Sequence, residues 1–163
     1  MAREKAVKTN ALRILDSHHI AYTTHAYLCE DGKIDGVSVA QKVGINPKRV
    51  FKTLVTQGAS HQFYVFVIGV EDELDLKKAA RAAQEKNIAM IHVADINKIT
   101  GYIRGGCSPV GMKKAFPTFI DLCADQFDSI VVSAGKIGLQ MDLPLQSLVE
   151  ITGAHLCDLI ATP

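Results

Sequence analysis

The sequence predicts one compact α/β domain, residues 1–163, built around a mixed β-sheet with flanking helices. Its 163 residues suit a single domain, and 48% apolar with 21% charged residues is typical of a soluble globular protein. Segments with helical periodicity alternate irregularly with short runs of β-branched and aromatic residues. Some predicted strands are joined by tight turns and others by helices, so both antiparallel and parallel pairing are expected.

The first quarter of the chain is predicted to contain a helix, a strand and a second helix. Apolar residues at helical spacing predict an amphipathic helix over 4–19. The aromatic and β-branched run 21–28 predicts a strand. Ser38 and Gln41 form a capping-box pattern, which predicts a short helix that ends at Gly44.

The next part of the chain is predicted to form a hairpin, a helix and a strand. The runs 49–56 and 62–70 predict two strands that turn at Gly58. The second run is almost entirely apolar, so it is expected to be buried on both faces. Residues 75–86 have one Ala/Leu face and one Lys/Arg face, which predicts a surface helix, and 88–93 predicts a further strand.

The last third of the chain is predicted to be mainly strands, after a short helix capped by Asp95. Short apolar runs predict strands at 118–122, 129–133 and 138–143. The last two of these are expected to form a hairpin across residues 134–136. Pro144 at a first helical position predicts a final helix to about Ile151, and 155–160 predicts an edge strand.

Charge and hydropathy restrict the possible functions. A formal net charge of +1 gives no overall field that attracts nucleic acid, so any RNA contact must be local or shared with a partner. No run approaches 18 apolar residues, and the N-terminus has no apolar signal segment. We therefore expect a cytoplasmic protein that makes no membrane contact and keeps its thiols reduced.

No motif for a metal or a cofactor is present, so neither is expected. The four cysteines lack CxxC spacing: Cys29, Cys107, Cys123 and Cys157. The six histidines show no HxxxH or HExxH spacing. The glycine-rich segment 101–114 matches neither the GxGxxG pattern nor the Walker A pattern of nucleotide-binding proteins.

The segment 101–114 is nevertheless the most unusual part of the sequence. It holds four glycines, one proline and three cations in fourteen residues. Glycine admits positive φ and lets a ligand approach the backbone, so such a loop can direct several N–H groups at one oxyanion. The alternative is an ordinary glycine-rich turn.

Lys52 is the most informative single charge. Alternate residues of a strand share a face, so Lys52 lies between the apolar Val50 and Leu54. It could be a cation at the floor of a pocket that binds a phosphate, a ribose hydroxyl or a carbonyl. It could also be an edge-strand lysine that discourages aggregation, or one that extends to water.

Three other side chains are candidates with simpler structural alternatives. Tyr27, at the end of its strand, is either a ligand contact or a half-buried aromatic residue. Cys107 could be a nucleophile, but no histidine is near in sequence, so a small apolar loop residue is favoured. Ser133 is either a pocket hydroxyl or, as its neighbours Ala134 and Gly135 favour, a turn residue.

Three segments together resemble the YbaK/EbsC family: 50–54, 101–111 and 133–139. Gly105 and Pro109 match the family's Gly-X-X-X-Pro loop, and the similarity extends over essentially the whole chain. The resemblance implies a largely antiparallel, barrel-like sheet, similar to the editing domain of bacterial prolyl-tRNA synthetases. It also implies a trans-editing enzyme that removes cysteine from mischarged Cys-tRNA(Pro), with the tRNA acceptor end and prolyl-tRNA synthetase as partners.

The resemblance also implies roles for individual residues. Lys52, Gly105 and Gly106 are expected to be catalytic. Substrate contacts are expected from eight further residues: Tyr27, Phe51, Thr53, Cys107, Ser108, Pro109, Ser133 and Gln140. Gln140 stands where many relatives have an acid. Asp142, on the same strand face, is a candidate to replace that acid.

In this family the thiol of the substrate's own cysteine is thought to attack the ester carbonyl and to leave as a thiolactone. The protein then supplies only orientation and charge stabilisation. We expect backbone N–H groups at 105–108 to hold the oxyanion, and Lys52 and Tyr27 to fix the terminal ribose and phosphate. The alternatives are a deacylase for another substrate such as Ala-tRNA(Pro), a non-catalytic module that binds aminoacyl-tRNA, and a metabolic regulator without RNA contact.

Overall fold

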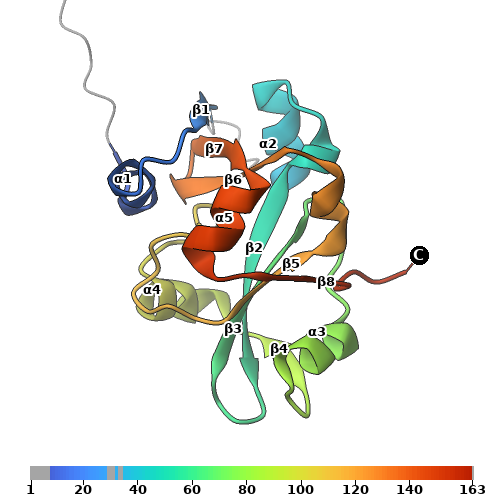
Figure 1. The fold of residues 1–163 in the computed structure, drawn as a ribbon. Helices are drawn as coiled ribbons and strands as arrows, with labels where there is room; N and C mark the ends of the chain where they lie inside the picture. Colours follow the sequence, from blue (N-terminus) through green and yellow to red (C-terminus); the bar gives the residue numbers. More distant parts are fainter. Residues whose placement is uncertain (1–7, 29–31, 33–34, 163) are drawn as a thin grey trace, which may run out of the picture.

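The computed structural model describes residues 8–28, 32 and 35–162, which form two β-sheets with helices around them (Figure 1). The α-helices are α1 (Asn10–Ser17), α2 (Gly36–Val43), α3 (Leu76–Ala83), α4 (Ile96–Thr100) and α5 (Leu145–Thr152). The strands are β1 (Thr23–Ala26), β2 (Phe51–Gly58), β3 (Phe63–Gly69), β4 (Ile88–Met90), β5 (Thr118–Asp121), β6 (Ser129–Lys136), β7 (Leu139–Pro144) and β8 (His155–Cys157). Short 3-10 helices are η1 (Pro47–Arg49), η2 (Val93–Asp95) and η3 (Leu122–Gln126).

The expected α/β domain with mixed strand pairing is confirmed, but the expectation of one barrel-like sheet is wrong. One sheet has the order β1-β7-β6 and is antiparallel; the other has the order β4-β2-β3-β5-β8. In the second sheet β5 runs parallel to both of its neighbours. Among the described residues, one parallel bridge, between Val50 and Val131, joins the two sheets. One bridge does not continue a hydrogen-bonded ladder around a ring, so no barrel closes.

The β2–β3 hairpin is covered on both faces, which explains its apolar sequence. β3 is buried along nearly its whole length, as predicted. On one face Phe51 and Val67 pack in the core between the two sheets, together with α1 and α5. On the other face Phe66 stacks on Phe119 at 5.4 Å between ring centroids, beneath α3. Successive residues of β2 therefore point into different layers of the protein.

Several element boundaries differ from those predicted. The helix expected to start at Ser38 begins at Gly36, because the Asp35 carboxylate accepts hydrogen bonds from the Ser38 amide (3.1 Å) and hydroxyl (2.7 Å) and is the N-cap. This helix ends at Gly44 with φ of +71°, as predicted. The first helix is confirmed from Asn10, whereas residues 1–7 lie outside the described part of the chain.

The strand predicted over 88–93 ends at Met90, and the chain then turns into η2. The β6–β7 hairpin is confirmed, but β6 continues to Lys136, so the turn is later than predicted. A shift in register between Ser133 and Lys136 marks a bulge, which re-aims side chains at this end of the sheet. In the described part of the chain, every helix is too short or too polar to cross a membrane.

Candidate functional site

A cavity of about 900 Å³, here called the main cavity, lies along the first half of β2. β4 pairs with β2 only from Thr56 to Gly58, so the preceding residues of β2 have no strand partner on that side. The Val55 carbonyl accepts a hydrogen bond from the Ile91 amide (3.3 Å), so the backbone N–H and C=O of Val55 face the edge of β2 that β4 extends. Because backbone groups alternate along a strand, the N–H and C=O of Thr53 face the main cavity as well.

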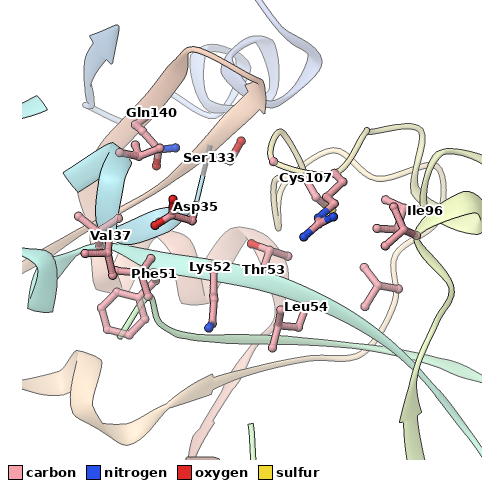
Figure 2. Close-up of a pocket in the computed structure, with 18 of the residues that line it drawn as sticks. Asp35, Val37, Phe51, Lys52, Thr53, Leu54, Ile96, Cys107, Ser133 and Gln140 are labelled. Carbon is pink, nitrogen blue, oxygen red and sulfur yellow. The ribbon is translucent and has the colours of Figure 1, made fainter. Parts of the chain in front are cut away.

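Seven of the predicted site residues line the main cavity: Phe51, Lys52, Thr53, Gly105, Cys107, Ser133 and Gln140. They come from β2, from the glycine-rich loop and from the β6–β7 hairpin, which are far apart in the sequence. Figure 2 shows Ser133 and Gln140 above β2, with Thr53 directed towards them and Cys107 beside them. The fold thus assembles most of the predicted site.

Four predicted residues lie outside the lining of the main cavity: Tyr27, Gly106, Ser108 and Pro109. Ser108 is fully buried, and its Oγ accepts a hydrogen bond from the Val110 amide (3.2 Å). Pro109 lines a second cavity of about 210 Å³ near α1 and α5. These two residues therefore shape the loop from behind.

Gly106 packs directly against the β6–β7 hairpin. A Cβ at Gly106 would lie 2.9 Å from the Ile137 amide nitrogen and 2.9 Å from the Lys136 backbone. The Gly106 N–H donates to the Ile103 carbonyl at 2.9 Å. In the described residues, by contrast, the amides of Gly105 and Cys107 have no hydrogen-bond acceptor. Gly105 also has φ of +82°, which favours glycine.

Two residues that line the main cavity, Thr53 and Gln140, carry unpaired polar atoms, and two further residues with such atoms lie outside its lining. Within the described residues, four buried side-chain atoms lack a hydrogen-bond partner: His25 Nε2, Tyr27 OH, Thr53 Oγ1 and Gln140 Oε1. Gln140 pairs with His25 across β1–β7 and with Ser133 across β6–β7, so three polar residues form one row across the sheet. Most buried polar atoms in proteins are hydrogen-bonded, so this cluster requires an explanation, and a polar ligand supplies one.

Lys52 lines the main cavity from a different side of β2 than Thr53. Its cross-strand partner Ile68 lies in the core beneath α3, whereas Val67, the partner of Thr53, lies in the core between the sheets. In Figure 2 the Lys52 ammonium points away from Ser133 and Gln140. Lys52 is half-buried and forms no ion pair with any other described residue, although its charge reaches Asp72, where burial raises the pKa of the carboxyl and Lys52 opposes that shift.

Cys107 is a neutral thiol in this environment. Burial raises the pKa of Cys107 to about 11, although a hydrogen bond with Thr100 opposes that shift. A nucleophilic cysteine requires the thiolate, which a basic partner or a cluster of N–H groups has to stabilise. The interpretation of Cys107 as a small cavity-lining residue is therefore favoured over that of a nucleophile.

Comparison with known proteins assigns the family. Residues 35–151, which include nearly the whole lining of the main cavity, match the aminoacyl-tRNA editing domain. The chain belongs to the aminoacyl-tRNA editing domain family. A full-length relative, EbsC of Enterococcus faecalis, is 42% identical over 98% of both chains and is provisionally named a Cys-tRNA(Pro)/Cys-tRNA(Cys) deacylase.

Solved structures show that this fold recurs at low sequence identity. A protein described provisionally as a trans-editing enzyme for prolyl tRNA synthetase is 22% identical, with a TM-score of 0.81 over 96% of this chain and 100% of the other. The hypothetical protein APE2540 is 17% identical, with a TM-score of 0.84 over 94% of this chain and 100% of the other. The editing domain described here shares their fold.

Asp142, the candidate to replace the family's acid, lies outside the lining of the main cavity. Both carboxylate oxygens of Asp142 accept from Arg49 Nη2 at 2.9 Å, and Arg49 also donates to the Ser129 hydroxyl. His25 Nε2 lies 3.9 Å from the same carboxylate. Asp142 thus forms an ion pair that links β7 to η1, whereas Gln140 and its cross-strand partner Ser133 line the main cavity at this corner.

Sequence reasoning missed two parts of the site. The start of α2, including Asp35 and Val37, and the segment from Met90 to Ile96 both line the main cavity. No motif marks either one, because their position depends on how helices pack beside β2. The available signal for the second segment was its apolar residues, most of which lie within the predicted strand 88–93.

Proposed function

We propose that this editing domain is a trans-editing deacylase that removes cysteine from mischarged Cys-tRNA(Pro), with residues 1–163 acting as one domain. The observation that carries the proposal is the 42% identity, over 98% of both chains, to EbsC, whose name gives that activity. The unpaired polar atoms beside the main cavity support it, because they suit a substrate with an amine, an ester and hydroxyl groups. Size alone separates cysteine from proline by only about 1–3 kcal/mol, so a second site is needed for accuracy.

The proposed mechanism uses the substrate's own sulfur. The cysteinyl Sγ attacks its ester carbonyl carbon, the bond from that carbon to the ribose oxygen breaks, and the thiol proton ends on the ribose oxygen. The products are a thiolactone and the free tRNA end. The cavity lining supports this route, because its two candidate nucleophiles are not activated. Cys107 is held as a neutral thiol, and the Ser133 hydroxyl accepts a hydrogen bond from the Gly135 amide (3.2 Å).

The protein's part in this reaction is to orient the ester and to stabilise charge. We assign the oxyanion to the Gly105 and Cys107 amides, which are free of other partners in the described part of the chain. An oxyanion donor is worth about 3–4 kcal/mol, and orientation up to ~7–11 kcal/mol. Lys52 and Tyr27 are assigned to the terminal ribose and phosphate, and Thr53 and Gln140 to the cysteinyl group.

Recognition of the tRNA body is proposed to depend on prolyl-tRNA synthetase. The net charge of +1 supports this, since the domain offers few phosphate contacts of its own. A cavity that binds only the acceptor end would treat Cys-tRNA(Cys) and Cys-tRNA(Pro) alike. Adding the synthetase should then favour tRNA(Pro), which competition between the two substrates can measure.

The decisive experiment is deacylation of Cys-tRNA(Pro) by wild type, Lys52→Ala and the matched control Lys77→Ala on the exposed face of α3. Wild type and Lys77→Ala should be equally active, and Lys52→Ala nearly inactive. Ser-tRNA(Pro) should react far more slowly than Cys-tRNA(Pro); equal rates would rule out the substrate-thiol mechanism. Faster release from Ala-tRNA(Pro) would identify a different editing deacylase, and tRNA binding without release would identify a binding module.

A further inference from the structure

One end of the main cavity is apolar and open to solvent. Its wall is formed by Met90 at the end of β4, Val93 in η2 and Ile96 at the start of α4. Met90 and Val93 are 47% and 56% exposed, although both border the cavity. In Figure 2, Ile96 lies on the opposite side of the cavity from Gln140. Exposed apolar side chains that gather at a cavity rim indicate a binding surface.

The main cavity is larger than a cysteinyl ester requires. Its volume of about 900 Å³ is near the upper end of the roughly 300–1,000 Å³ that holds a ligand of drug size. The polar end, with Thr53, Ser133 and Gln140, offers enough groups for one amino acid. The apolar end therefore has room for the next part of an aminoacylated nucleoside.

We propose that the wall formed by Met90, Val93 and Ile96 binds the face of the terminal nucleobase of the tRNA. This inference rests on the proposed function and extends it to a subsite. A nucleobase is a flat aromatic group, and the polarisable thioether of Met90 makes favourable contacts with aromatic rings. Arg104 lines the same cavity, and a guanidinium plane stacks well on a base.

Contact with the face of a base carries no sequence information, because every base has such a face. tRNAs share the same 3′-terminal nucleotide, so a deacylase gains affinity from that base without having to identify it. Base identity should matter little at this subsite, and loss of the base should matter strongly.

The test uses a stable amide analogue, 3′-deoxy-3′-(L-serylamino)adenosine, and the same compound without its base. Binding is measured by calorimetry for wild type, Val93→Ser, Met90→Ser and the control Leu122→Ser. Leu122 is 52% exposed and outside the cavity lining, so its loss matches the change in exposed apolar surface. Wild type should bind the adenosine compound roughly tenfold more tightly than the abasic compound.

Val93→Ser and Met90→Ser should each weaken binding of the adenosine compound about two- to fivefold and leave binding of the abasic compound unchanged. Equal binding of the two compounds by wild type, or equal effects of Val93→Ser and Leu122→Ser, would overturn the subsite. The binding measurement needs no turnover. Base-dependent binding without deacylation would therefore support the subsite and overturn the proposed activity. Deacylation without base-dependent binding would support the proposed activity and overturn the subsite.

Discussion

Gly106→Ala should separate the role of the glycine-rich loop in activity from its role in stability. The added Cβ would lie 2.9 Å from backbone atoms of both Lys136 and Ile137, where ordinary contacts are 3.4 Å or more. Backbone atoms cannot rotate away as a side chain can, so the loop and the β6–β7 hairpin must move apart by roughly 0.5–1 Å. That hairpin carries Ser133 and Gln140, and the loop carries the Gly105 amide.

The expected size of both effects follows from this geometry. Overpacking of this kind costs about 1–3 kcal/mol, which for a chain of this length lowers Tm by roughly 2–12 °C. A 1 Å displacement of a catalytic group can cost about 100-fold in rate, so kcat for Cys-tRNA(Pro) deacylation should fall by about that factor. The measurements are thermal unfolding and single-turnover deacylation.

Gly44→Ala is the matched control. Gly44 has φ of +71° and nothing within 4 Å of the added Cβ, so alanine there is strained by about 1–2 kcal/mol without a clash. Its Tm should fall by a similar amount, while deacylation should stay within about twofold of wild type at 25 °C. Equal activity loss in both variants would show that activity simply follows stability, and full activity in Gly106→Ala would refute the geometric argument.

Three further changes test other parts of the site. Arg49→Met leaves the half-buried Asp142 carboxylate without its partner and should lower the free energy of urea unfolding by about 2–3 kcal/mol. The control Lys78→Met, at the more exposed ion pair with Asp158, should lower it by less than about 1 kcal/mol. Because the pKa of Cys107 is raised from 9.0 to about 11, the neutral thiol stabilises the fold fully below pH 9 and progressively less up to pH 11. Cys107→Ala should therefore lose less stability than wild type over pH 9–11, and should stay active at pH 7.5. Gln140→Leu removes an unpaired acceptor at similar volume, so kcat/KM should fall by about tenfold or more while stability is kept or raised by ~1 kcal/mol.

The sequence predicted the order of elements well, because local signals determine them. The apolar run of β3, Gly44 as a helix end and the β6–β7 hairpin all follow from periodicity and turn chemistry. The cap of α2 was misassigned, because Asp35 and Ser38 both suit an N-cap and only the backbone conformation decides between them. The barrel-like sheet, which was expected from the family resemblance, was wrong because closure depends on long-range strand pairing that a resemblance in short motifs does not determine.

The candidate site was predicted in part for the same reason. Lys52 and the loop with Gly105 carry motifs, so a single sequence can indicate them. That Lys52 and Thr53 serve different sides of the main cavity follows from strand alternation, but it becomes apparent only once the two cores are placed. The apolar wall from Met90 to Ile96 has no motif at all, since its function depends only on where it lies.

The unpaired polar atoms provide a physical reason to place function at this corner of the fold. Leaving a buried donor or acceptor unpaired costs about 1–3 kcal/mol, and leucine or valine at Thr53 or Gln140 would avoid that cost. A domain of this size is stabilised by only about 5–15 kcal/mol, so several such atoms reduce its folding free energy by a large fraction. In the proposed complex these atoms gain partners when a substrate enters, which directs binding energy to the end of the cavity assigned to the cysteinyl group. The unpaired atoms thus lower the stability of the free protein and strengthen binding of the proposed substrate. Gln140→Leu should therefore raise stability and lower kcat/KM.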